Sequence, residues 1–217
     1  MKVNQFGRSM VEMLGVLAII GVLSVGAIAG YQKAMFKHKM NKTMDIISHA
    51  VNRLAELDTM RLDTTVEFDT SLLVKYGLMP DCDVNHVNIW GEKGGYCPLP
   101  LGEVAINFTQ SENYSMTAYL DLIFLQEPFD SCAAFLSSGI YKNVPDDWWY
   151  PYCEDCDGGG FISLHTEVSN KYFYGNSEYA LSQGATSNPT NQNILEACEI
   201  CKNANYCNIY WVIRNDF

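Results

Sequence analysis

Cysteines are the residues of this chain whose number and spacing most directly suggest chemistry, with eight in 217 residues. Cys153 and Cys156 form one Cys-x2-Cys pair, and Cys198 and Cys201 form another. Four thiolates can hold zinc, but the roughly 40 residues between the pairs exceed the roughly 15–20 of compact zinc ribbons. So many cysteines in a short chain fit an oxidising compartment. We therefore expect disulfides and keep zinc as the alternative.

The pairing of these cysteines does not follow from their spacing, because eight cysteines allow many combinations. We favour Cys82 with Cys97, since this pair would close a small loop. Each bridge would add about 2–4 kcal/mol of stability by constraining the unfolded chain. The candidates for the other bridges are Cys132, Cys153, Cys156, Cys198, Cys201 and Cys207.

Residues 145–160 carry two further candidate sites. Glu154, Asp155 and Asp157 could bind calcium through their carboxylates, but their spacing does not match an EF-hand, and a solvated turn is favoured. A neighbouring aromatic cluster could be an adhesion patch, although aromatic side chains this dense are more often buried. Its members are Trp148, Trp149, Tyr150 and Tyr152.

No set of residues typical of an enzyme stands out in the sequence. The four histidines show no spacing suited to metal binding or to a general base; they are His38, His49, His86 and His165. The sequence also lacks a phosphate-binding loop, a nucleophile elbow and paired catalytic carboxylates. We expect a protein that is not an enzyme and that holds neither a cofactor nor a metal.

One carboxylate, Glu12, lies at the start of a long apolar run. Residues 10–29 are otherwise apolar or small, and the stretch from Leu14 to Leu23 holds no charge. About 20 residues of helix span roughly 30 Å, the thickness of a bilayer's hydrocarbon core. A charge at mid-bilayer costs about 2.5–3.5 kcal/mol, so Glu12 needs a partner or a place near the headgroups.

Residues 6–14, with the run that follows them, resemble the N-terminal signature of type IV prepilins. The shared features are a short polar leader that ends at Gly7, Glu12 at the fifth position after it, and a long apolar helix. The resemblance implies cleavage after Gly7 and methylation of the new N-terminus at Arg8. It also implies a filament in which the Arg8 amine pairs with Glu12 of a neighbouring copy. The family most often has Phe where this chain has Arg8.

The resemblance further implies partners and a location. The partners are a prepilin peptidase, a pilus or type II secretion assembly machinery, and further copies of the chain. The chain would cross the inner membrane once, with its head in the periplasm, and would enter an extracellular filament. The order of elements in the head is similar to that of type IVb pilins, whose bridge to the C-terminal segment would here join Cys132 to Cys207. The four remaining cysteines would then pair among themselves.

Two other interpretations give the chain a different N-terminus. Leu14 to Leu23 could be the apolar part of a secretory signal that is cut after Ala29, which would release a disulfide-rich binding protein. Alternatively, an uncleaved single-pass protein could face inward with a zinc-binding head. The lysines after the apolar run outnumber the basic residues before it, which by itself favours the inward orientation. Those lysines are Lys33, Lys37, Lys39 and Lys42.

Charge is divided unequally along the chain. Residues 1–53 carry seven basic and two acidic groups, whereas residues 54–217 carry seven basic and 23 acidic groups. Nucleic-acid binding needs clustered basic side chains, so the acidic part argues against nucleic acid as a partner.

Hydrophobic spacing predicts one helix from Ser9 to about Leu57. Beyond Tyr31, apolar side chains recur every three or four residues, which predicts a stripe packed against a globular head. The members of the stripe are Phe36, Met40, Met44, Ile47, Val51 and Leu54. The expected domains are a leader at 1–7, a long helix at 8–57 that crosses the membrane at about 10–29, and a head at 58–217.

Within the head, turn signals and apolar runs predict a mixture of strands and helices. The strands are expected at 104–109, 119–125 and 208–214, and the helices at 71–76, at 130–138 and after Thr190. An antiparallel sheet laid on the long helix and held by disulfides is an α+β fold.

Overall fold

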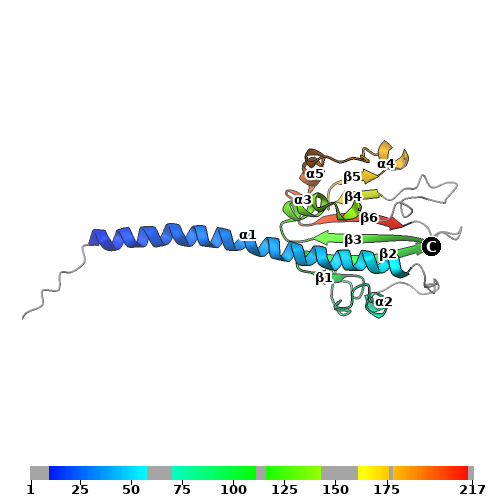
Figure 1. Ribbon diagram of the computed structural model, residues 1–217, viewed down its shortest axis with the longest axis horizontal. Helices are drawn as coiled ribbons and strands as arrows, with labels where there is room; N and C mark the ends of the chain where they lie inside the picture. Colours follow the sequence, from blue (N-terminus) through cyan, green and yellow to red (C-terminus); the bar gives the residue numbers. More distant parts are fainter. Residues whose placement is uncertain (1–9, 58–69, 111–115, 143–160, 176–177, 215–217) are drawn as a thin grey trace, which may run out of the picture. The chain divides into compact units, whose positions relative to one another are not determined.

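The structure is a computed structural model that describes residues 10–57, 70–110, 116–142, 161–175 and 178–214 (Figure 1). The chain divides into two compact units, residues 1–39 and residues 40–217. The described part of the first unit is the N-terminal part of helix α1 (Met10–Leu57). The second unit comprises the rest of α1 and the head.

Helix α1 is one unbroken run of 48 residues, about 72 Å long. This confirms the prediction of a single helix that runs as far as Leu57. In the second unit, α1 buries side chains at three- and four-residue steps, as a helix packed on one face requires. These side chains are Met40, Thr43, Ile47, Ala50, Val51 and Leu54. Phe36 and Met44, also predicted in the stripe, are only half-buried.

Six strands form one antiparallel sheet with the order β1-β2-β3-β6-β4-β5. Their bounds are β1 Cys97–Leu99, β2 Gly102–Gln110, β3 Met116–Phe124, β4 Phe161–His165, β5 Asn170–Gly175 and β6 Cys207–Arg214. Strand β6 comes last in the chain but lies between β3 and β4. The predicted strands correspond to β2, β3 and β6, whereas β1, β4 and β5 were not predicted.

One face of the sheet belongs to the core of the head. Along β3, Leu120, Leu122 and Phe124 are buried, while the alternate residues Tyr119 and Asp121 are half-buried. The residues from 119 to 122 thus show the two-residue alternation of a strand with one covered face. Ile123, on the same side of the strand as Tyr119 and Asp121, is fully buried, so the other face is covered as well at this end of β3.

Helix α3 (Pro128–Ser138) covers the buried face of the sheet. The ring of Phe135 lies 6.1 Å from that of Phe124 and 6.3 Å from that of Trp211 on β6. Gly139 ends α3 with a φ of 67°, the left-handed conformation that glycine adopts at helix C-termini. The predicted helix at 130–138 is therefore confirmed.

The other helices are short. Their bounds are α2 Thr70–Lys75, η1 Ile140–Lys142, α4 Glu178–Ser182, α5 Asn191–Cys198 and η3 Glu199–Cys201. Helix α5 begins with a capping box in which Thr190 and Asn193 satisfy each other's backbone N–H groups. The helix predicted after Thr190 is thus confirmed, and the head is an α+β fold on an antiparallel sheet.

The described residues form three disulfides: Cys82–Cys97, Cys132–Cys198 and Cys201–Cys207. The first confirms the predicted pair. The predicted bridge between Cys132 and Cys207 is wrong, because Cys132 bonds to Cys198 on α5 instead.

The prediction that the four remaining cysteines pair among themselves is also wrong. Cys198 and Cys201 bond to partners outside that group. For the same reason they are not free to share a zinc ion with Cys153 and Cys156, which lie outside the described residues.

Candidate membrane and assembly segment

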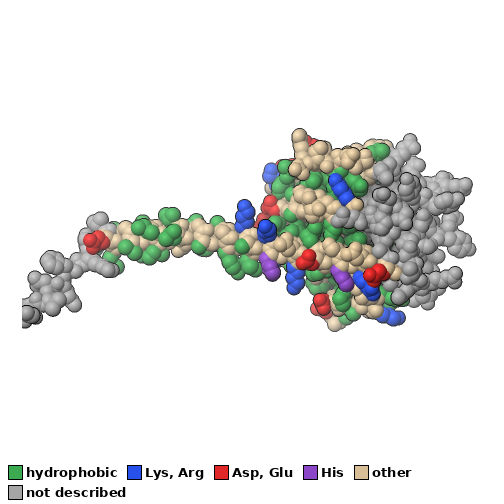
Figure 2. All heavy atoms as spheres, in the orientation of Figure 1, with side chains coloured by type: hydrophobic (Ala, Val, Ile, Leu, Met, Phe, Trp, Pro, Cys, Tyr) green, Lys and Arg blue, Asp and Glu red, His purple; other side chains and the backbone are tan. Residues whose placement is uncertain are grey.

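The N-terminal part of α1 exposes all of its described side chains. From residue 10 to residue 34, no side chain that the structure describes is even half-buried. Figure 2 shows hydrophobic side chains along this part of the helix. A helix that is apolar all round needs an apolar environment, either a bilayer or other helices. The large exposed apolar residues are Met10, Met13, Leu14, Val16, Leu17, Ile19, Ile20, Val22, Leu23, Val25, Ile28 and Tyr31.

This segment is long enough to span a membrane. Among the described residues, one helix qualifies by length and composition, over Glu12–Leu54, and it lies near the N-terminus. Nothing in its most apolar 18-residue window is buried. The core helix of a soluble protein is also long and apolar, but it is mostly buried, so the exposure of this segment distinguishes it from such a helix. A signal sequence near the N-terminus can have the same length and composition.

The polar side chains of the segment are few. The hydroxyl of Ser24 donates a hydrogen bond to the carbonyl oxygen of Ile20 at 2.7 Å, so the helix itself satisfies it. Glu12 lies exposed in the first turn, where the positive end of the helix dipole favours a carboxylate. Between Glu12 and Lys33 the sequence has no other charged residue. In an apolar environment Glu12 would therefore need a partner from outside the segment.

Four glycines give this segment open backbone surface. A Cβ atom added at Gly15, Gly21, Gly26 or Gly30 would have no atom of the described chain outside the local helix backbone within 4 Å. The fold of the chain therefore does not require glycine at these positions. Small residues on a membrane helix let a second helix approach its backbone closely.

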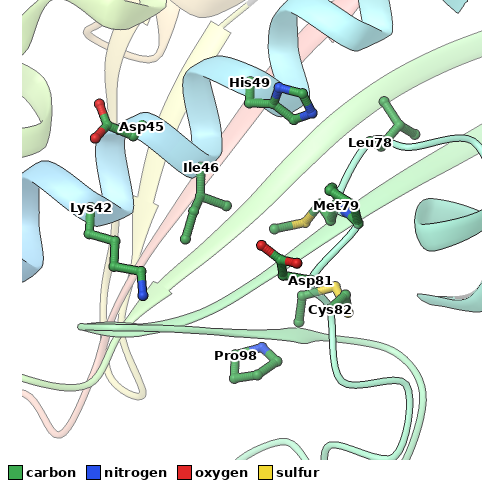
Figure 3. Close-up of a pocket in the computed structure, with 11 residues that line it drawn as sticks. Lys42, Asp45, Ile46, His49, Leu78, Met79, Asp81, Cys82 and Pro98 are labelled. Carbon is green, nitrogen blue, oxygen red and sulfur yellow. A yellow bond between two sulfur atoms is a disulfide. The ribbon is translucent and has the colours of Figure 1, made fainter.

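A groove of about 400 Å³ lies in the head beside α1. Lys42, Asp45, Ile46 and His49 of the helix line it, and Figure 3 shows Lys42 and Ile46 extending toward the side of the groove that carries Asp81. The disulfide between Cys82 and Cys97 lines the opposite wall. The groove holds no group of three metal-ligating side chains that the described residues bring together.

The second face of the sheet carries a polar and aromatic cluster around Asp121. The Tyr96 hydroxyl donates a 2.5 Å hydrogen bond to Asp121 Oδ2, and Tyr210 pairs with Asp121 across β3 and β6. Burial raises the pKa of Tyr96, and the hydrogen bond to Asp121 adds to this. Burial likewise raises the pKa of Tyr119 and Tyr210. These phenols therefore remain neutral hydrogen-bond donors at physiological pH.

Serine, histidine and aspartate meet in this cluster without forming a nucleophilic relay. Ser163 Oγ and His165 Nε2 are 2.8 Å apart, but Ser163 is buried. Burial lowers the pKa of His165, while the charge of Asp121 opposes that effect. In the described part of the chain, Asp121 accepts from Tyr96 and makes no hydrogen bond to His165. The third contact that would orient the imidazole is missing.

A buried acid was missed by the sequence reasoning. Glu103 on β2 is 3% exposed, and its Oε1 lies 3.4 Å from Nε2 of His86. The sequence did contain a sign of it, because Glu103 directly precedes the apolar residues 104–106 of a predicted strand. Of the other histidines, His38 and His49 are exposed on α1.

Several predicted site residues lie outside the described residues. They are Gly7 and Arg8 of the leader junction, the acidic group Glu154, Asp155 and Asp157, and the aromatic group Trp148, Trp149, Tyr150 and Tyr152.

Comparison with known proteins gives no relative. No protein-family model, curated protein or solved structure matches this chain.

Proposed function

We propose that this chain is the structural subunit of a type IV pilus or of a related pseudopilus-like filament. In this proposal a prepilin peptidase cuts after Gly7, α1 holds the subunit in the inner membrane, and the head faces the periplasm. Subunits then assemble through their N-terminal helices, with the help of a pilus or type II secretion machinery. The protein carries out no catalysis of its own.

The observation that carries the proposal is the two-part character of α1. One unbroken helix exposes an apolar surface up to residue 34 and then buries a stripe from Met40 to Leu54. Such a helix both anchors a protein in apolar surroundings and forms part of a folded head. Glu12 at its first turn is the one charged residue of α1 before Lys33.

Glu12 has a specific role in this proposal. A carboxylate in apolar surroundings is strongly disfavoured unless a cation neutralises it. Cleavage after Gly7 creates an α-amine on Arg8, four residues before Glu12. The amine of one subunit pairs with Glu12 of the next, so each added copy neutralises a charge of its neighbour.

Substitution of Glu12 tests this role. Glu12→Gln keeps the size of the side chain and removes its charge, so we expect filament assembly to fail while the head stays folded. Glu12→Asp, which keeps the charge, should retain part of the assembly. Asp45→Asn removes a carboxylate from the same helix outside the exposed apolar part and is the matched control. Filaments of normal abundance in the Glu12→Gln strain would contradict the role of the charge pair.

A further inference from the structure

Sulfur atoms from two disulfides of the head meet in its core. The sulfurs of Cys132, Cys201 and Cys207 lie within 4.8 Å of one another. Cys201 and Cys207 are bonded to each other. Cys132 is bonded instead to Cys198, which does not belong to this group. One sulfur of the first bridge therefore lies beside both sulfurs of the second.

Contacts other than the bridges hold these three buried cysteines together. Cys132 lies on α3, Cys201 ends η3, and Cys207 begins β6. The ring of Phe135 on α3 packs against that of Trp211 on β6, with 6.3 Å between their centroids. The ammonium group of Lys202, next to Cys201 in the sequence, lies 5.9 Å from the centre of the Phe129 ring on α3. The three sulfurs therefore remain neighbours when the bridge between α3 and α5 is absent.

Disulfide exchange requires such an arrangement of sulfurs. A thiolate breaks a disulfide by attacking one of its two sulfurs, and the other sulfur leaves as a thiolate. In the head, the sulfur of Cys132 is at most 4.8 Å from either sulfur of the neighbouring bridge. Rotation of the side chains has to shorten that distance to about 2 Å, the length of an S–S bond. Because the attacking sulfur and the bridge belong to one folded unit, the reaction is unimolecular and is favoured over attack by a dissolved thiol.

We propose that Cys132, Cys201 and Cys207 form a thiol–disulfide exchange centre, at which a bridge between two of them passes to the third. The thiol of Cys132 first loses its proton to the solvent. Its sulfur then attacks Cys207, so that the bond between Cys132 and Cys207 forms as the bond between Cys201 and Cys207 breaks. Cys201 leaves with the bonding electron pair and takes up a proton. Attack on Cys201 releases Cys207 in the same way, and neither route needs an oxidant or a reductant.

Cys198 stops the exchange in the finished head. Its bond to Cys132 removes the attacking thiol, and no cysteine that the structure describes is left free. As that bond forms, a disulfide donor accepts two electrons and two protons from the thiols of Cys132 and Cys198. The centre therefore acts during oxidative folding, when Cys201 and Cys207 are bonded and Cys132 is still reduced. It lets the chain rearrange bridges within the head without an external thiol, and it does not depend on filament assembly.

Removal of Cys198 tests the proposal, because it leaves Cys132 free beside the other bridge. The full-length Cys198→Ser variant in detergent is incubated at about pH 8.5, where thiolates form, and is then acidified, labelled with a maleimide and digested. We expect peptides that join Cys132 to Cys207 or to Cys201, with the label on the cysteine that was released. A label on Cys132 alone, with no such peptide, would overturn the proposal.

The matched control is Cys97→Ser, which frees Cys82. Among the described residues, neither Cys82 nor Cys97 belongs to a group of three neighbouring sulfurs. The label should therefore stay on Cys82 alone. A label that spreads to other cysteines in this control would overturn the proposal as well, because exchange would then not depend on the arrangement in the core.

Oxidative refolding of the wild-type chain gives a second test that needs no variant. The full chain in detergent is reduced in denaturant, refolded in a glutathione redox buffer and acidified at intervals, and its bridges are mapped. At intermediate times, bridges from Cys132 to Cys201 or Cys207 should be several-fold more abundant than bridges from Cys132 to Cys82 or Cys97. They should then give way to the final pairs. Equal abundance of the two kinds of bridge would overturn the proposal, even if Cys198→Ser does not fold.

Discussion

The two parts of α1 differ in how they expose their apolar side chains, although they belong to one helix. Up to residue 34, every side chain that the structure describes is exposed, and the exposed residues are mostly apolar. From Met40 to Leu54, the same helix buries one stripe that is apolar except for Thr43, while Lys42, Asp45 and His49 are exposed. The first part depends on surroundings that the chain itself does not provide, whereas the second part completes a core. Substitutions of one type should therefore have different effects in the two parts.

Isoleucine truncation should show the largest difference. Ile47 is 0% exposed, so Ile47→Ala should lower the free energy of unfolding of the head by about 2–5 kcal/mol. Ile20 is 53% exposed on the same helix, and Ile20→Ala should leave the unfolding of the head unchanged. Urea unfolding of the full chain in detergent, followed by tryptophan fluorescence, measures both. Equal destabilisation by the two variants would contradict the division of α1.

The bridge between Cys82 and Cys97 should have the next largest effect. It closes a loop of 15 residues and lines the groove beside α1. Replacing both cysteines with serine should cost about 2–4 kcal/mol, measured by the same unfolding experiment. Peptide mapping of the unreduced protein is the accompanying check on connectivity. A peptide that joins Cys132 to Cys207 would contradict the pairing that the structure gives.

Glycine-to-alanine substitutions provide a third comparison. A Cβ at Gly102 on β2 would lie 1.8 Å from the carbonyl oxygen of Ile123, a backbone atom that cannot turn aside. Gly102→Ala should therefore lower the free energy of unfolding by about 1–3 kcal/mol or more. A Cβ added at Gly26 would have no such neighbour within 4 Å, so Gly26→Ala should leave the free energy of unfolding of the head unchanged. Thermal melts of the two variants compare them directly, and a stable Gly102→Ala head would refute the close strand contact.

The smallest expected effect is the pH dependence that His165 contributes. Burial lowers the pKa of its imidazole below the ordinary 6.5, so the unfolded state takes up the proton first as the pH falls. Its stabilising contribution is therefore complete above that value and is lost as the pH falls through the folded-state pKa. The loss should be under about 1 kcal/mol, because the side chain is partly solvated. Urea midpoints at two pH values should fall more for the wild type than for His165→Gln; an equal fall would contradict the assignment.

Local patterns in the sequence were sufficient to predict α1 and half of the sheet. The three- and four-residue spacing from Met40 to Leu54 specifies a helix with one buried face. Strands β2, β3 and β6 stand out as long apolar runs. Strands β4 and β5 are short and contain several polar residues, such as Ser163 and His165, so they did not stand out.

The position of β6 in the sheet and the partners of the cysteines could not be predicted, because both depend on how distant parts of the chain pack together. The sequence gives no reason for β6 to lie between β3 and β4. Cys132 lies close to both Cys201 and Cys207, yet bonds to Cys198. Cys201 and Cys207 are six residues apart and bond to each other. The resemblance to type IVb pilins implied a different partner for Cys207. The assembly role of Glu12 remains a prediction, because it depends on contacts with other copies.

The mass of the mature N-terminal peptide tests the central proposal most directly. Protein purified from the membranes of cells that make it would be digested and its N-terminal peptide sequenced by mass spectrometry. The account predicts a chain that begins at Arg8, with methylation of its amine as a small added mass. A chain that begins at Gly30, or one that still carries Phe6 and Gly7, would contradict it.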